Sequence, residues 1–264
     1  ADPAGAEDRD ADGQPVGRQQ RWPAPLEGIE GGGQSVSGHV AQVLDQALTH
    51  TAQAAQSAAP TPARDFLQGR DLKVVDATTV EEQGGAGTDW RVHYTLCLPD
   101  LSCDFFELTD EKSGETYRRI PVQPGDLLLA DRGYSNAPGV RAVVEAKGDV
   151  LVRWNSFSFP LQTVDGKPFQ AFKEMNKLPK RGCREWKVSF VQEGKRYTGR
   201  LCGIRKNAVA TTRAQEKLRR QARKKQKEVS EDALKLAAFI MVFTTASEEA
   251  LSTKDVLELY RVRW

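Results

Sequence analysis

Two apolar runs in the middle of the chain each contain one aspartate. Residues 71–80 read DLKVVDATTV, with Asp76 inside the run, and residues 125–135 read GDLLLADRGYS, with Asp131 after the leucines. Short apolar or β-branched runs of this kind are typical of buried strands. An aspartate in such a strand costs desolvation free energy unless it is paired or binds a cation, so both residues are candidate metal ligands. The ordinary alternative is that each caps a turn or pairs with an arginine such as Arg132.

Further strands are predicted around these runs. WRVHYTLCL (90–98) alternates apolar and polar residues and CDFFELTD (103–110) is also short and apolar, so the first three strands are expected to form an antiparallel meander. A helix is expected over 138–147 and a strand over 149–154. This order is not that of a simple doubly wound α/β sheet. A helix before the fourth strand would give the ribonuclease H-like order, but residues 111–124 show no helical pattern.

The segment that follows residue 154 is rich in proline and basic residues. From there to the end, two short strands are expected over 184–191 and 195–204, and a helix over 213–227. A buried strand over 237–245 and a final helix from about Ser252 follow. The final helix carries an N-terminal signal, because Asp255 follows Ser252 by three residues, which is the spacing of a capping box.

The charge is distributed unevenly, although the net charge of the chain is only +2. Residues 173–227 hold 19 basic and 4 acidic side chains, a net charge of +15. Within 213–227 the basic residues recur on one helical face and Glu216 is the only acid, so ion pairing within the helix cannot explain the run. A dense positive run favours a polyanionic partner. A solvated charged helix is the alternative.

The composition excludes several classes of protein. No apolar run in the 264 residues approaches the ~18 residues of a membrane span, and no basic-plus-apolar signal peptide opens the chain. The four cysteines form no C-x-x-C pair and lie far from the three histidines. A zinc site and a dense disulfide framework are therefore not expected, and the cysteines are interpreted as reduced thiols in a cytosolic protein.

The two ends differ from the middle. Residues 1–34 hold seven Gly and four Pro, which predicts disorder, whereas residues 36–58 show the apolar spacing of a helix. The sequence does not begin with Met, and residues 253–264 look helical and stop without a cap, so we expect a fragment cut inside a helix. The expected divisions begin with a disordered start (1–34), a helical segment (35–69) and the first part of a core (70–154). A basic insertion (155–235) and the last strand and helix of the core (236–264) follow.

Five motifs resemble those of one protein family. VVDATTV, WRVHYTLCLPDLSCDFFELTD, GDLLLADRGYS, FTT and YRVRW follow one another here in the order found in the DDE transposases of bacterial insertion sequences. The group is the one named after insertion sequence four, whose last motif is Tyr-x2-Arg-x3-Glu-x6-Lys. The resemblance covers about residues 70–264. It implies an α/β fold with a ribonuclease H-like catalytic core and a mostly β, basic insertion before the last helix, which residues 155–235 fit.

The resemblance also implies roles for single residues. Asp76 and Asp131 match the first two catalytic aspartates, and so the ligands of Mg²⁺ (or Mn²⁺). Tyr260 and Arg263 match the Tyr and Arg that contact the phosphates at the DNA ends. The complete set of residues expected to orient the site loop or to bind DNA is Arg132, Tyr134, Arg213, Lys217, Arg220, Arg223, Lys224, Lys225, Tyr260 and Arg263.

The implied activity is DNA transposition. An intact enzyme of this kind would hydrolyse a phosphodiester at the transposon end with Mg²⁺-activated water, and the freed 3′-hydroxyl would attack the target DNA. The implied partners are transposon-end and target DNA and a second copy of the chain, as a homodimer in a synaptic complex, without a membrane. The implied location is the bacterial cytoplasm, in association with the nucleoid.

The sequence departs from the family pattern at both ends. The third catalytic carboxylate should fall four residues after Arg263, but the sequence stops at Trp264, and the Lys of the motif is also missing. The first 70 residues do not resemble the usual DNA-binding start of the family. The expectation is therefore a partial transposase that is inactive as it stands. Two alternatives stay open: a nucleic-acid-binding remnant without catalysis, and a basic RNA-binding adaptor in which the aspartates are incidental.

Overall fold

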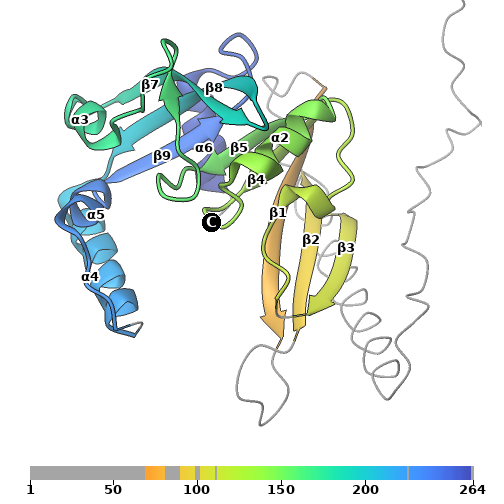
Figure 1. Cartoon of the computed structure of the whole chain (residues 1–264), viewed down its shortest axis with the longest axis horizontal. Coiled ribbons are helices and arrows are strands. Elements are labelled where there is room, and N and C mark those ends of the chain that lie inside the picture. Colours follow the sequence, from red (N-terminus) through yellow and green to blue (C-terminus); the bar gives the residue numbers. More distant parts are fainter. Residues whose placement is uncertain (1–68, 81–89, 99–101, 111, 225, 263–264) are drawn as a thin grey trace, which may run out of the picture. The chain divides into compact units, whose positions relative to one another are not determined.

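The computed structural model describes residues 69–80, 90–98, 102–110, 112–224 and 226–262 (Figure 1). The disorder predicted for 1–34 and the helix predicted for 36–58 lie outside these residues. So do Lys225 and Arg263 of the expected DNA-binding set, and Trp264. The described part is a mixed α/β fold built on one large mixed sheet, whose strand order is β3-β2-β1-β4-β5-β9-β8-β7-β6.

The first half of the sheet confirms the predicted meander. Its strands are β1 (Asp71–Val80), β2 (Trp90–Leu98), β3 (Cys103–Asp110), β4 (Asp126–Ala130) and β5 (Asp149–Arg153). Neighbours among β1, β2 and β3 run antiparallel, whereas β4 is parallel to β1 and β5 is parallel to β4. Strands β1, β2, β3 and β5 lie within a residue or two of the predicted ranges, because side-chain alternation and turn residues define strands locally. Strand β4 is shorter than the run 125–135, since it ends at Ala130 before the polar residues that follow.

Two short helical elements flank β4. A single 3₁₀ turn, η2 (Tyr117–Arg119), precedes the strand, and the Thr116 side chain accepts a hydrogen bond from the Arg118 amide at its start. No longer helix forms between 112 and 124 in the described chain, in agreement with the missing helical pattern. Helix α2 (Ala137–Glu145) follows β4. The Asn136 side chain caps it by accepting a hydrogen bond from the Gly139 amide at 2.8 Å, the usual role of Asn before a first turn that contains proline.

The second half extends the same sheet. The remaining strands are β6 (Gln162–Thr163), β7 (Cys183–Gln192), β8 (Lys195–Arg205) and β9 (Phe239–Thr244). Strand β9 pairs antiparallel with β5 on one side and with β8 on the other, and β7 and β8 form a hairpin. The hairpin turns at Glu193 and Gly194, both at positive φ, as two-residue hairpin turns of the primed type require. The basic segment is thus hydrogen-bonded into the sheet through β6, β7 and β8.

The later helices are α3 (Ala171–Asn176), α4 (Ala208–Lys224), α5 (Glu231–Leu236) and α6 (Thr253–Val262). Helix α4 begins five residues before the predicted 213, because Asn207 caps it through a hydrogen bond from the Ala210 amide at 2.8 Å. The predicted capping box of the last helix is present. The Asp255 amide donates to Ser252 Oγ at 3.3 Å, and the Ser252 amide donates to Asp255 Oδ2 at 3.2 Å. The sequence did not predict α3, α5 or β6.

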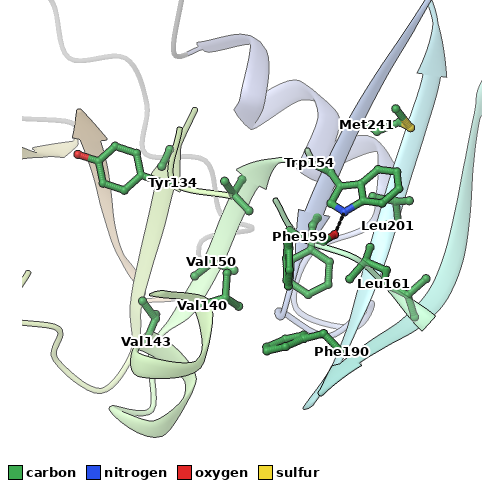
Figure 2. Close-up of a cluster of buried hydrophobic side chains, with 14 of the residues drawn as sticks. Tyr134, Val140, Val143, Val150, Trp154, Phe159, Leu161, Phe190, Leu201 and Met241 are labelled. Atoms are coloured by element: carbon green, nitrogen blue, oxygen red, sulfur yellow. Dashed lines mark hydrogen bonds between the residues drawn. The ribbon is translucent and has the colours of Figure 1, made fainter. Parts of the chain in front are cut away.

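Apolar side chains cover both faces of the central strands. On one face Val150 of β5 packs with Val140 and Val143 of α2, and the cluster continues to Phe159 and Phe190 (Figure 2). On the other face Leu127, Leu129 and Leu151 pack with Val256, Leu259 and Tyr260 of α6. All five residues of β4 are buried. A strand buried on both faces is continuously apolar rather than alternating, which is why LLLA marked β4 so clearly.

Two expectations from composition can be compared with the structure. No two of the four cysteines are joined in a disulfide, in line with the prediction of thiols. Among the helices that the structure describes, none combines the length and the apolar character that a membrane span requires.

Candidate functional site

The structure places Asp76 and Asp131 at the same level of two adjacent parallel strands: Asp76 lies in the middle of β1, and Asp131 directly follows the last residue of β4. Val75 of β1 lies opposite Ala130 of β4, so each aspartate is the next residue along its chain. Asp76 Oδ1 accepts a hydrogen bond from the Ala77 amide at 2.9 Å, and Asp131 Oδ1 accepts one from the Gly133 amide at 2.7 Å. Both side chains are half-buried. These bonds fix the direction of each carboxylate. Carboxylate oxygens are the ligand type that Mg²⁺ and Mn²⁺ prefer.

A third carboxylate lies beside this pair. The pKa of the buried Tyr134 hydroxyl is raised, first by burial and then by the carboxylates of Glu115, Asp76 and Asp131 in that order. A Cβ atom at Gly133 would lie 1.5 Å from Glu115 Oε2 and 3.1 Å from Asp131 Oδ1. All three carboxylates therefore lie within electrostatic range of the Tyr134 hydroxyl. Within the described ranges, however, no three acidic, His or Cys side chains are arranged to hold a metal ion together.

Sequence reasoning missed Glu115. It precedes η2 by two residues in an irregular stretch, and it is followed neither by an apolar run nor by a recognisable motif. Its contacts come from the fold, including an ion pair with Arg91 in which Nη1 and Oε1 are 3.9 Å apart. The only local signal is Gly133 directly after Asp131 and Arg132, a position where a side chain would collide with Glu115.

A cavity of about 700 Å³ opens next to Asp131, and it is strongly basic. We call it the basic cavity. Its cationic lining is Arg132, Arg153, Lys206 and Lys217. Burial, and then Arg153 and Arg132, lower the pKa of Lys206 to about 8, and burial followed by Arg153 lowers the pKa of Arg132. Cations that lower one another's pKa are held close together against their repulsion, and an anionic ligand would relieve that repulsion.

Tyr260 adds a polar group to the basic cavity. Its ring is packed in the α6 cluster and the residue is only 4% exposed. Tyr260 borders the basic cavity, and in the described part of the chain its buried hydroxyl has no hydrogen-bond partner. A buried polar group without a partner costs about 1–3 kcal/mol, and such a group at a cavity wall is explained by a ligand that completes its hydrogen bonding. The sequence assigned Tyr260 to DNA contact, and its position is compatible with that role.

Part of the lining of the basic cavity is apolar. It is formed by Trp154, Phe157, Leu236, Phe239 and Met241. Trp154 is fixed by a hydrogen bond from its indole Nε1 to the Phe159 carbonyl at 2.8 Å (Figure 2), whereas Phe157 is 95% exposed. None of these residues was predicted to take part in function, because each one alone is typical of a core or a loop.

The basic helix α4 forms another part of the wall. Ala214, Lys217, Leu218 and Gln221 line the basic cavity at i, i+3, i+4 and i+7, the spacing of one helical face. Gln215 Nε2 donates to the Leu234 carbonyl at 3.0 Å and joins α4 to α5, which lies beside it in Figure 1. The remaining described basic residues of the prediction are exposed outside the basic cavity: Arg213, Arg220, Arg223 and Lys224.

The structure therefore divides the predicted site residues into groups. Asp131, Arg132, Lys217 and Tyr260 line the basic cavity. Asp76 and Tyr134 adjoin Asp131 on the meander side, through the electrostatic contacts of Tyr134. Arg153 and Lys206 were not predicted, and they reach the basic cavity from the ends of β5 and β8, positions that only the strand order reveals.

Comparison with known proteins gives one consistent result. No model of a known protein family matches the chain. The chain is 26% identical over 204 residues to the putative transposase InsL for insertion sequence element IS186A of Escherichia coli K12, an alignment that covers 74% of this chain and 55% of that protein. It is equally similar, 26% over 204 residues, to the transposase for insertion sequence element IS421 of Escherichia coli, of which 54% is covered. The chain spans about half the length of the curated relatives it matches.

Proposed function

We propose that this relative of insertion-sequence transposases binds DNA and holds two carboxylates of a cation-dependent site that cleaves and joins transposon-end DNA. One observation carries the proposal. Asp76 of β1 and Asp131 after β4 lie at the same level of adjacent parallel strands, each one residue beyond the paired Val75 and Ala130, and Asp131 borders a cavity lined by Arg132, Arg153 and Lys206. Acidic ligands beside phosphate-binding cations are the two components that phosphoryl transfer requires.

The strand arrangement supports the classification of the fold as ribonuclease H-like. The order β3-β2-β1-β4-β5, with β1–β3 antiparallel and β4 and β5 parallel to β1, is consistent with a ribonuclease H-like core, although a single 3₁₀ turn, η2, stands where that core would have a helix before the fourth strand. The elements β6, β7, β8 and α3–α5 then form the insertion that precedes α6. The proposed boundaries of the core and the insertion remain those stated from the sequence: 70–154, 155–235 and 236–264.

Asp76 and Asp131 would hold the cation, Mg²⁺ or Mn²⁺. When bound, a divalent cation would supply Lewis-acid stabilisation of the charge that develops on the transferred phosphate. The chain's own groups act around it. The Gly133 amide orients the Asp131 carboxylate, and Tyr134, kept neutral by its raised pKa, places an uncharged phenol within electrostatic range of the carboxylates. Arg132, Arg153 and Lys206 then bind DNA phosphate next to Asp131.

The exposed basic residues of α4 extend this phosphate-binding surface. Helix α4 has no buried residue in the described chain, so it gains little from packing, and its positive charges repel one another unless a polyanion is bound. Its contacts to DNA would be made to the backbone and would not read the sequence. Transposon-end and target DNA are the proposed partners, with a second copy of the chain in the synaptic complex.

Nicking of supercoiled plasmid tests the proposal. We expect the chain to bind duplex DNA and to nick it weakly at most with Mg²⁺ or Mn²⁺, because in the described ranges no third acidic, His or Cys side chain completes a metal site with Asp76 and Asp131. We expect Asp131→Asn to abolish any nicking while duplex binding persists, because the substitution removes a negative charge near the phosphate. Asp165→Asn, in an exposed loop, is the matched control and should nick normally. Nicking that survives Asp131→Asn would overturn the site assignment. Binding without any nicking would favour the alternative of a DNA-binding protein without catalysis.

A further inference from the structure

A buried arginine in β8 makes hydrogen bonds to the segment that leads into α6. Arg200 is 6% exposed. Its Nε donates to the Ala246 carbonyl at 2.8 Å, and its Nη2 donates to the carbonyls of Ser247 at 3.0 Å and Leu251 at 2.7 Å. One guanidinium thus satisfies three backbone carbonyls between β9 and α6. Only the planar fork of arginine offers donors in this arrangement.

The neighbouring strand completes the arrangement. Glu185 of β7 accepts a hydrogen bond from Arg200 Nη1 at 2.6 Å, and the same oxygen accepts one from Thr253 Oγ1, also at 2.6 Å. Thr253 is the first residue of α6. The buried Cys202 thiol lies 3.9 Å from this carboxylate oxygen, and burial raises its pKa to about 12. Glu185 and Arg200 together therefore hold both the loop and the first residue of the helix.

Stability alone does not account for such a pair. Two desolvated charges are often replaced by apolar side chains of similar volume without loss of stability, whereas removal of one partner is costly. What the pair supplies, and apolar packing does not, is a defined backbone path for residues 246–253. Tyr260 lies seven residues, or two helical turns, after Thr253. A shift at the start of α6 is therefore carried to the Tyr260 hydroxyl at the wall of the basic cavity.

The strand that carries Arg200 also ends at the basic cavity. Lys206 directly follows β8, its amide donates to the Ala238 carbonyl at 2.8 Å, and its ammonium donates to the Ala237 carbonyl at 2.8 Å. Strand β8 thus binds the start of α6 at Arg200 and places a cavity cation six residues later. The relative position of Tyr260 and Lys206 is set through one strand.

We propose that Arg200 and Glu185 are positioning residues for the phosphate-binding wall of the basic cavity. They fix the start of α6 so that the Tyr260 hydroxyl faces the same phosphate as Lys206. The proposal deepens the proposed function and rests on it in one respect, namely that phosphate is the ligand of the basic cavity. The coupling between the Arg200 pair and α6 is independent of the ligand.

Two variants separate positioning from folding. Arg200→Lys keeps the charge and loses the fork. Thr253→Val removes one hydrogen bond from the helix start and leaves the Arg200–Glu185 pair intact, so it remains informative if Arg200→Lys fails to fold. Arg196→Lys is the matched control, because Arg196 lies on the same strand and donates to Ser189 Oγ rather than to the loop. Urea unfolding of each variant shows which proteins are folded and comparable.

Hydrogen exchange measures the positioning directly. In Arg200→Lys and Thr253→Val we expect faster amide exchange in residues 246–260, with β4 and β5 unchanged, and no change in Arg196→Lys. Exchange that rises uniformly across the sheet, or not at all in residues 246–260, would overturn the proposal. This readout uses no DNA, so it can succeed even if the proposed function fails.

A double-mutant cycle measures the consequence for binding. The probe is a short DNA duplex. We expect Tyr260→Phe to lower the affinity for this duplex about tenfold, because a hydrogen bond to a charged group has about that value. Arg200→Lys should weaken binding several-fold in the wild-type background and less than about twofold in the Tyr260→Phe background, because coupled residues are not additive. Additive effects would overturn the positioning role. An unchanged affinity in Tyr260→Phe alone would contradict phosphate contact by Tyr260 and so overturn the positioning role, while the proposed function would still be judged by the nicking assay.

Discussion

At the scale of single residues, Gly133 shows why the sequence after Asp131 reads as it does. A Cβ atom there would lie 1.5 Å from Glu115 Oε2, so any side chain must displace Glu115 from the carboxylate group around Tyr134. Because Glu115 is a flexible and partly exposed side chain that can move aside, we expect Gly133→Ala to destabilise the fold by no more than the lower end of the about 1–3 kcal/mol that overpacking costs. Urea unfolding measures the free energy of unfolding.

The matched variant Glu115→Ala tests the cause. It removes the atoms that the new methyl group would meet, so the double variant Gly133→Ala, Glu115→Ala should be less destabilised than the sum of the two single variants. Strict additivity would show that Gly133 is needed for backbone conformation alone and would disprove the contact with Glu115.

Lys206 gives the basic cavity a pH dependence. Its pKa is lowered to about 8 by burial and by Arg153 and Arg132, so the folded state disfavours the charged form. This lysine therefore adds stability to the free protein as pH rises above about 8 toward the unfolded value of about 10.4. The affinity for phosphate should change with pH in the opposite direction, because phosphate binding needs the protonated ammonium.

We therefore expect the affinity for a short duplex to fall as the pH rises from about 7 to about 9. Lys206→Arg, which stays charged throughout this range, should bind with a flatter pH profile. Fluorescence anisotropy at constant ionic strength measures both proteins. Equal pH profiles for the two would remove Lys206 from the phosphate-binding wall.

At the scale of elements, the sequence predicts whatever is encoded locally. The alternation in WRVHYTLCL, the continuous run LLLA and the Ser252–Asp255 pair define β2, β4 and the start of α6 without reference to the rest of the chain. Strand β6 and helices α3 and α5 have two to six residues, too few for a periodic pattern. The sequence at their ends carries only partial signals of secondary structure, such as Ser230, whose side chain caps α5.

Helix α4 is the element whose role is most open to direct measurement. We expect replacement of Arg220, Arg223 and Lys224 by Gln to weaken duplex binding and to lower the slope of log affinity against log salt by about 2 to 3, or about 0.9 for each phosphate that is no longer neutralised. Gln substitution of the exposed Lys112, Arg118 and Lys147 removes the same charge elsewhere and should change the slope little. If both triple variants behave alike, α4 contributes only net charge and is a solvated face.

At the scale of the whole molecule, the sheet brings the candidate site together. Asp131, Arg153 and Lys206 lie at or just beyond the ends of β4, β5 and β8, and Asp76 lies in the middle of the neighbouring β1. The strand order, which no local pattern contains, brings these strands together. The resemblance supplied the aspartates and Tyr260, whose motif residues are contiguous in sequence. Arg153, Lys206 and Glu115 could not be found this way, because their significance comes from tertiary contacts alone.

The buried ion pair between β1 and β4 illustrates the same limit. Lys73 Nζ lies 2.9 Å from Asp126 Oδ2 and 2.6 Å from Asp104 Oδ2, so it links β1 to both β4 and β3. Burial alone would lower the pKa of Lys73, but its bonds to Asp104 and Asp126 outweigh burial and raise it. In DLKVVDATTV the lysine interrupts an apolar run, and its partners lie far away in sequence.

The central claim is that Asp76 and Asp131 share a divalent cation, and Mn²⁺ titration by calorimetry in the absence of DNA tests it most directly. Asp76→Asn and Asp131→Asn are compared with the wild-type chain and with Asp165→Asn as the matched control. We predict that the wild-type chain and the control bind Mn²⁺ alike. In each site variant the affinity for Mn²⁺ should fall by more than the factor of about ten to a hundred that removal of an outer-shell partner costs. Mn²⁺ binding that is unchanged when both Asp76 and Asp131 are replaced would contradict the account.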